Sequence, residues 1–149
     1  MIIKEELNSA LEELEVVIRH NQEDEMVKRI RGALEALDAH LIVQDEKGKK
    51  RVHIADIYYL ESVDKKTFVY CQDSVYTTDL RLYQVLEELE GKGFIQISKS
   101  MILNIHMLES VTSLLNRRLE ITLKNGEKII ATRKYIESIK HALEGDQYA

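Results

Sequence analysis

Basic residues in this chain cluster in short segments between runs of β-branched and aromatic residues. The clusters that stand out are Lys65-Lys66, Lys99, Arg117-Arg118 and Arg133-Lys134. Lysine and arginine bind phosphate oxygens, and arginine can also donate hydrogen bonds to O6 and N7 of guanine. Loops at one edge of a β-scaffold could carry these cations to a nucleic acid. By themselves, however, the clusters favour the simpler interpretation that basic loop tips keep a protein soluble.

Residues that could carry catalysis or bind a metal ion show no useful spacing. The five histidines, at positions 20, 40, 53, 106 and 141, form no i,i+4 pair and have no neighbouring cysteines, so we predict no metal site. Gly91 and Gly93 lack the further glycine and the lysine–serine pair of a phosphate-binding loop. Cys71, the single cysteine, excludes an internal disulfide and is interpreted as a small core residue rather than a nucleophile. We therefore predict no enzyme activity and no cofactor.

The distribution of charge is uneven. The net charge of −5 argues at first against a nucleic-acid partner. Residues 1–46, however, carry 5 basic and 12 acidic residues, whereas residues 47–141 carry 16 basic and 12 acidic residues. The acidity thus belongs to the ends of the chain, and its middle is mildly basic. Such asymmetry is typical of a polyanion-binding module with an acidic companion, with uneven surface charge of no functional consequence as an equal alternative.

Neither a membrane span nor an export signal is visible in the sequence. The longest apolar runs are only a few residues long, as at 57–60, whereas a spanning helix needs ~20 apolar residues. The N-terminus has no basic flank leading into an apolar stretch. We therefore expect a cytoplasmic protein with no membrane insertion of its own.

The N-terminal third predicts a small α/β element. It begins with candidate extended segments at 1–3 and 16–19, and the apolar residues from Leu7 to Leu14 offer a short helix as an alternative. A clearer helix is predicted from about Asp24 to Leu37, because its apolar residues recur every three or four positions. Acidic residues in its first turn interact favourably with the helix dipole. A strand at 41–43 follows.

From Asp45 onward the pattern changes to short strands and tight turns. β-Branched and aromatic residues predict strands at 51–54, 57–63, 67–70, 75–78, 94–97, 110–114, 119–123 and 129–132. An amphipathic helix from about Leu82 to Leu89 interrupts them, and a final helix is predicted from 134 to about 143. Asn125-Gly126 is the strongest hairpin signal in the chain. The predicted fold class is α+β and mostly β, with two helices in this part.

An ordered set of motifs runs through residues 94–135. An aromatic-led strand is followed by Ser98-Lys99-Ser100, an apolar pair before Asn104, the Asn125-Gly126 hairpin and a closing Thr-Arg-Lys-Tyr at 132–135. Upstream, residues 54–62 read Ile-Ala-Asp-Ile-Tyr-Tyr-Leu-Glu-Ser. In this order and with these gaps, the motifs strongly resemble the signature of LytTR-type DNA-binding domains over about residues 50–143.

The resemblance implies an elongated scaffold of β-strands whose loops enter successive major grooves on one face of a DNA duplex. It implies DNA contacts at Lys65, Lys66, Thr67, Ser98, Lys99, Ser100, Arg133 and Lys134. Ser100 is expected to support a phosphate contact, and Asn104 is expected to fix the local turn. Many family members carry histidine or arginine near the position of Ser98, so the identity of the base-reading residue stays open here.

The resemblance also divides the chain into an acidic N-terminal element at 1–46 and a DNA-binding domain at 47–149. The first element is too short for the phosphorylatable receiver of the family's response regulators, and the layout resembles that of stand-alone LytTR regulators. Such regulators are often encoded with a small membrane protein that restrains them. The implied partners are double-stranded DNA, a second copy of the chain and such a membrane protein. The N-terminal element would dimerise the protein, bind the restraint or complete the fold.

Two other classes of function stay open on the sequence alone. The β-scaffold could be a protein–protein adaptor that binds no DNA, or it could hold a hidden ligand or catalytic site. A duplex-binding assay over a range of salt concentrations separates the adaptor from a DNA-binding regulator. A well-formed apolar pocket lined by perturbed groups would support the ligand or catalytic site.

Overall fold

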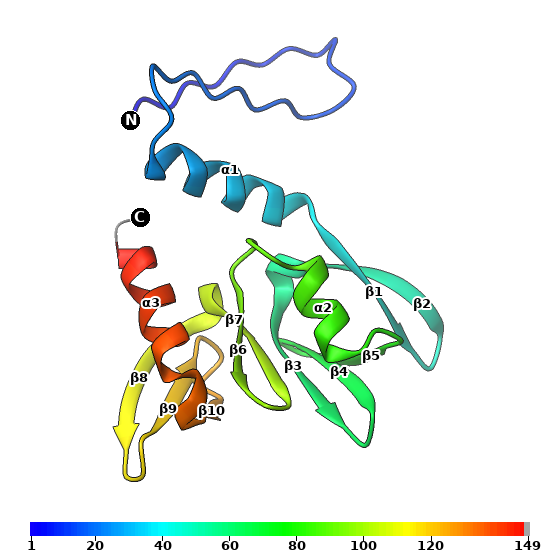
Figure 1. Ribbon diagram of the computed structural model, residues 1–149. Helices are drawn as coiled ribbons and strands as arrows, with labels where there is room; N and C mark the ends of the chain where they lie inside the picture. The colour runs from blue at the N-terminus through cyan, green and yellow to red at the C-terminus, as the bar shows by residue number, and fades with distance from the viewer. Residues whose placement is uncertain (148–149) are drawn as a thin grey trace.

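A computed structural model describes residues 1–147 as two antiparallel sheets with helices packed against them (Figure 1). The larger sheet, in the order β2-β1-β5-β4-β3-β7-β6, consists of β1 (His40–Asp45), β2 (Gly48–His53), β3 (Ile57–Val63), β4 (Lys66–Cys71), β5 (Val75–Thr78), β6 (Phe94–Ser98) and β7 (Met101–Asn104). The smaller sheet, in the order β10-β9-β8, consists of β8 (Leu108–Leu114), β9 (Arg118–Leu123) and β10 (Lys128–Ala131). This architecture confirms the predicted mostly β, α+β class.

Three α-helices and three short 3-10 turns complete the described fold. The α-helices are α1 (Glu25–Asp38), α2 (Leu82–Glu88) and α3 (Ile136–Gln147), and the 3-10 turns are η1 (Ile54–Asp56), η2 (Ile105–Met107) and η3 (Arg133–Tyr135). Both helices predicted in the C-terminal part are thus confirmed, the second beginning slightly later than expected. None of the described helices is both long enough and apolar enough to cross a membrane.

The N-terminal part follows the prediction only from α1 onward. Asp24 caps α1 by accepting a hydrogen bond from the backbone N–H of Val27 at 2.8 Å. The segments at 1–3 and 16–19 do not form strands, and the alternative helix between them does not form either. Residues 1–24, called the arm below, instead form two extended limbs on the side of α1 away from the sheets (Figure 1). An extended segment becomes a strand only with a pairing partner, and the described chain provides none for the arm.

Strand β1 belongs to the larger sheet although it precedes the region of resemblance. It pairs with β2 along its whole length and with β5 at Gln44 and Thr77. The hydroxyl of Thr78 donates to the backbone oxygen of Ile42 at 3.0 Å, which ties β5 to β1 again. Leu41 and Val43 are buried in the core. The boundary expected between residues 46 and 47 therefore runs through the turn of the β1–β2 hairpin.

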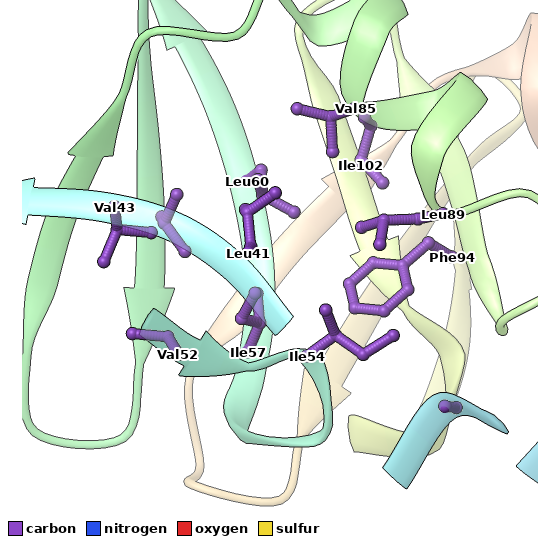
Figure 2. Close-up of a cluster of buried hydrophobic side chains, with 12 residues drawn as sticks. Leu41, Val43, Val52, Ile54, Ile57, Leu60, Val85, Leu89, Phe94 and Ile102 are labelled. Carbon is purple, nitrogen blue, oxygen red and sulfur yellow. The ribbon is translucent and has the colours of Figure 1, made fainter. Parts of the chain in front are cut away.

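The buried side chains form two cores, one on each face of the larger sheet. In the first core, Val85 of α2, Leu89 just after α2 and Phe94 of β6 lie against side chains of the larger sheet such as Leu41, Leu60 and Ile102 (Figure 2). In the second core, side chains from the smaller sheet and α3 pack against the opposite face. A bulge in β3 shifts its register between Ile57 and Tyr59 and directs two neighbouring tyrosines into the second core. Both faces of β3 are thus covered, which explains the unbroken apolar run at 57–60.

Asn104 has the structural role that the resemblance implied. Its side chain is buried, and its amide nitrogen donates to the backbone oxygen of Ile57 at 2.9 Å. Its amide oxygen accepts from the backbone N–H of His106 at 3.1 Å and so begins η2. Asn104 therefore fixes both the turn after β7 and the start of β3.

Candidate nucleic-acid interface

The loops that hold the predicted contact residues meet at one end of the two sheets. The turns β3–β4 and β6–β7 are neighbours, because the backbone N–H of Ser62 donates to the oxygen of Ser100 at 2.8 Å. η3 lies beside the end of β6, because the N–H of Thr132 donates to the oxygen of Ile97 at 2.9 Å. Three chain segments that are far apart in sequence are thus held in a fixed order by backbone hydrogen bonds.

The turn between β8 and β9 extends this row on the side of the smaller sheet. Ala131, at the end of β10, pairs with Leu119, near the start of β9. The β8–β9 turn and η3 therefore lie at the same end of the smaller sheet. The four segments, in the order β8–β9 turn, η3, β6–β7 turn and β3–β4 turn, are called the loop row below. The loop row and the arm lie at opposite ends of the molecule (Figure 1).

Five of the eight predicted contact residues project from the loop row as exposed cations: Lys65, Lys66, Lys99, Arg133 and Lys134. Within residues 1–144, whose side chains the structure describes, no hydrogen bond or ion pair engages these five side chains. The ammonium of Lys134 lies 5.6 Å from the centre of the Tyr135 ring. Their charges are therefore available to a ligand.

The three hydroxyl residues of the predicted set are placed differently. Ser98 and Ser100 are half-buried in the β6–β7 turn, where the hydroxyl oxygen of Ser98 accepts from the N–H of Ser100 at 3.3 Å. Ser98 thus shapes the turn that presents Lys99. Thr67 lies next to the β3–β4 turn but is only 2% exposed. It can position the turn, whereas its side chain has no surface to offer a ligand.

Further arginines lie at the same end of the molecule. Arg117 and Arg118, in and beside the β8–β9 turn, are exposed; their cluster is visible in the sequence, but the resemblance assigns them no contact. Arg81 was missed. It lies just before α2, and its guanidinium donates to the backbone oxygen of Lys65 at 3.5 Å. This contact extends the positive surface beyond the β3–β4 turn.

The β3–β4 turn holds its lysine in an uncommon backbone conformation. Asp64 and Lys65 have φ angles of +51° and +66°, and Val63 pairs with Lys66. Two central residues with positive φ define the type I′ turn, which matches the twist of a hairpin. That turn favours glycine at its second central position, and a lysine there stores roughly 1 kcal/mol of strain. The turn therefore keeps a cation where glycine would be more stable.

A polar cluster joins the two sheets at the β9–β10 turn, at the end of the smaller sheet away from the loop row. The hydroxyl of Tyr59 on β3 donates to Glu127 in the β9–β10 turn at 2.5 Å, and the rings of Tyr59 and Tyr70 stack with their centres 4.3 Å apart. Burial, followed by the hydrogen bond to Glu127, raises the pKa of Tyr59 well above its usual range. Burial also raises the pKa of Tyr70. Both phenols thus stay neutral at physiological pH, and the contact ties β3 of the larger sheet to the β9–β10 turn of the smaller sheet.

Comparison with known proteins finds a matching family model and a solved structure with a similar fold. The family model described as the LytTr DNA-binding domain matches residues 47–144. Among solved structures, the LytTr DNA-binding domain of a protein named as a methyl-accepting/DNA response regulator from Bacillus cereus is similar, with a TM-score of 0.67 and 22% identity. That likeness covers 71% of this chain and 97% of the solved domain.

The curated relatives are longer proteins, and this chain matches only a part of each. An uncharacterized HTH-type transcriptional regulator of Staphylococcus aureus (strain bovine RF122 / ET3-1) is 29% identical over 92 residues, which make up 62% of this chain and 62% of the relative. The sensory transduction protein LytT of Bacillus anthracis is 28% identical over 120 residues, or 80% of this chain and 49% of LytT. The chain thus spans between about half and three-fifths of the length of these relatives.

Proposed function

The chain belongs to the LytTr DNA-binding domain family, and from this premise we propose that it is a transcriptional regulator that binds double-stranded DNA sequence-specifically. One observation carries the proposal. Loops from both sheets, held together by backbone hydrogen bonds, gather exposed cations at one end of the molecule. The cations of this surface are Lys65, Lys66, Arg81, Lys99, Arg117, Arg118, Arg133 and Lys134. A polyanion is the ligand that such a surface favours.

The order of the loops along the duplex supports different kinds of DNA contact for different loops. The β6–β7 turn and η3 are adjacent and central, and we assign base contacts in a major groove to Lys99 and Arg133. The β3–β4 turn, with Lys65 and Lys66, would enter the next groove along the same face. Lys65, Lys66, Lys134 and Ser100 are assigned to phosphates, because lysine and hydroxyl groups bind phosphate oxygens. Ser98 and Thr67 hold the two turns in shape.

We propose binding rather than catalysis. Burial raises the pKa of the Cys71 thiol to about 11, so the thiol stays protonated at neutral pH and is a poor nucleophile. Among the side chains that the structure describes, those of residues 1–144, histidine, cysteine, aspartate and glutamate form no group of three that could hold a metal ion. A DNA ligand would also place the chain in the cytoplasm.

We further propose that the chain acts as a homodimer and that a small membrane protein restrains it. Two linked copies on neighbouring DNA sites gain avidity without new contacts. The arm and α1 of the acidic N-terminal third lie away from the loop row (Figure 1), which supports a role for them in assembly or regulation rather than in DNA contact. The strand of the N-terminal third, β1, is part of the larger sheet that carries two turns of the loop row.

The first prediction concerns ionic strength. If about four of the cations contact phosphates, log affinity should fall against log salt concentration with a slope of about −3 to −4, because each contact releases counterions. Affinity would then drop roughly a hundredfold between about 50 and 200 mM salt. Fluorescence anisotropy of a labelled duplex measures the slope. An affinity that hardly responds to salt would rule out this mode of binding and favour a protein–protein adaptor.

The second prediction uses the strained lysine. Lys65→Gly should raise the free energy of unfolding by roughly 0.5–1 kcal/mol, because glycine adopts positive φ without strain. The same substitution should weaken duplex binding several-fold and reduce the salt slope by about 0.9, since one phosphate contact is lost. Urea unfolding and the anisotropy titration measure the two effects.

The matched control is Lys124→Gly, in the β9–β10 turn at the other end of β9. Lys124 is exposed like Lys65 but does not have a positive φ. This variant should gain no stability and should bind DNA like the parent chain. Equal DNA affinities of Lys65→Gly and the parent chain would remove Lys65 from the interface.

A further inference from the structure

A groove of about 510 Å³ opens between α1, the loop at 91–93, β6, η2 and α3. Its floor consists of small and aliphatic side chains such as Ala33, Ile95 and Ile105. Its rim carries the basic residues Lys28, Arg29 and Lys92 and the acidic residue Glu25, which pairs with Lys28 at 3.4 Å. The groove is therefore apolar at its base and positive at its edge, and it lies at the end of the molecule away from the loop row.

The arm has the complementary character. All of its large apolar side chains except Ile18, among them Leu7, Leu11 and Leu14, are between 49% and 98% exposed. Residues 1–19 also carry five glutamates against one lysine and one arginine. Soluble proteins rarely leave so many neighbouring apolar side chains in water unless a partner covers them. The arm is thus an acidic, apolar segment without a surface to pack on in the single chain.

We propose that the arm of one copy binds in the groove of a second copy, in a reciprocal exchange that forms a symmetric dimer. Apolar side chains of the arm cover the floor of the groove, and its glutamates face the lysines of the rim. At roughly 3.3 Å per extended residue, the arm is long enough to reach a neighbouring molecule. This inference deepens the proposed homodimer but is independent of DNA binding.

The geometry of Asp24 favours exchange over a return into the chain's own groove. The arm leaves α1 on the side away from the sheets (Figure 1), and Asp24, its last residue, caps α1 through the bond to Val27. A return would require the arm to bend back around the N-terminal end of α1 (Figure 1). Exchange between two copies leaves the cap intact. Each groove is then filled by the arm of the other copy, so both copies make the same contact, as in an isologous interface.

The first test is self-association of the full-length chain, measured by sedimentation without DNA. Leu7→Asn and Leu14→Asn should each weaken the dimer about tenfold or more, because each removes apolar burial at the interface. Both side chains are more than nine-tenths exposed in the single chain, so thermal unfolding of the monomer should not change. Tyr83→Asn, an equally conservative loss of an exposed apolar side chain on α2, is the matched control and should leave the dimer intact.

A charge exchange tests the pairing of arm and rim directly. Glu12→Lys with Glu13→Lys should weaken the dimer, and so should Lys28→Glu with Lys92→Glu. A chain that carries all four substitutions should recover most of the lost affinity, because the charges are complementary again. Recovery would not occur if the arm and the rim belonged to separate surfaces.

Cross-linking separates exchange from a return within one chain. In a Cys71→Ser background, Leu14→Cys and Ala33→Cys are prepared as separate proteins, mixed and oxidised, and a disulfide-linked dimer is expected. A chain that carries both cysteines and cross-links at monomer mass would overturn the exchange, as would a dimer indifferent to the arm variants or a monomer at every concentration. Lys99→Ala should leave self-association unchanged, so failure of the dimer and failure of DNA binding are distinguishable.

Discussion

A fragment that begins at residue 47 is expected to be strongly destabilised, whereas a fragment that begins at residue 24 is expected to fold and bind DNA. The family match starts at 47, but β1 lies before it in the chain and between β2 and β5 in the sheet. Leu41 and Val43 of β1 are each 1% exposed. Losing the burial of both costs roughly 3–6 kcal/mol, a large share of a typical stability of about 5–15 kcal/mol. Thr78 would also lose its acceptor on Ile42.

Circular dichroism and urea unfolding of the two fragments measure this difference. Fragment 24–149 is the matched control, because it removes the acidic arm but keeps the Asp24 cap, α1 and β1. It should bind duplex DNA with a salt slope per chain close to that of the full-length protein, and its affinity should fall only by the avidity lost with the dimer. A folded fragment 47–149 that binds DNA as tightly as fragment 24–149 would contradict the role given to β1.

Strands could be predicted from the sequence where one face of the strand is buried and the other is exposed to solvent. In β9, Leu119, Ile121 and Leu123 alternate with polar residues, and all three are buried as that alternation implies. β7 was missed, because the turn before it, Lys99-Ser100, contains no glycine or asparagine to mark a hairpin. In the arm, by contrast, strands were predicted that do not form. Its apolar and β-branched residues fit a strand, but local pattern does not report whether a pairing partner exists.

The site could be predicted in part, because the resemblance identifies loop residues and the sheet order decides which of them share a surface. Thr67 shows the limit. It follows the turn lysines directly in sequence, yet it is buried where β4 pairs with β5 opposite Thr78. Arg81 is the opposite case, a residue on the surface that the sequence did not assign to it. Its position before a predicted helix indicates only a helix boundary. Its proximity to Lys65 arises from the order β5-β4-β3, which no local pattern specifies.

Arg133→Ala is expected to weaken binding to the preferred duplex by roughly 1–3 kcal/mol, or about 5- to 150-fold, and to relax preference at one base pair. Arg133 is exposed at the start of η3, beside the β6–β7 turn. Its planar guanidinium can donate two hydrogen bonds to one guanine, whereas a lysine acts as a point charge. Within the described residues its side chain has no partner in Glu137 or elsewhere. The variant should therefore keep the circular dichroism spectrum and melting temperature of the parent chain.

Competition between the preferred duplex and duplexes substituted at single positions measures the loss of preference. Lys99→Ala, in the adjacent turn, is the matched comparison. If Lys99 contacts a base as we propose, its loss lowers specific binding far more than non-specific binding. If Lys99 contacts a phosphate instead, all sequences weaken about equally and the salt slope falls by about one unit. An Arg133→Ala variant that melts earlier while keeping its DNA preference would show that Arg133 supports η3 and that another residue of the loop row reads the bases.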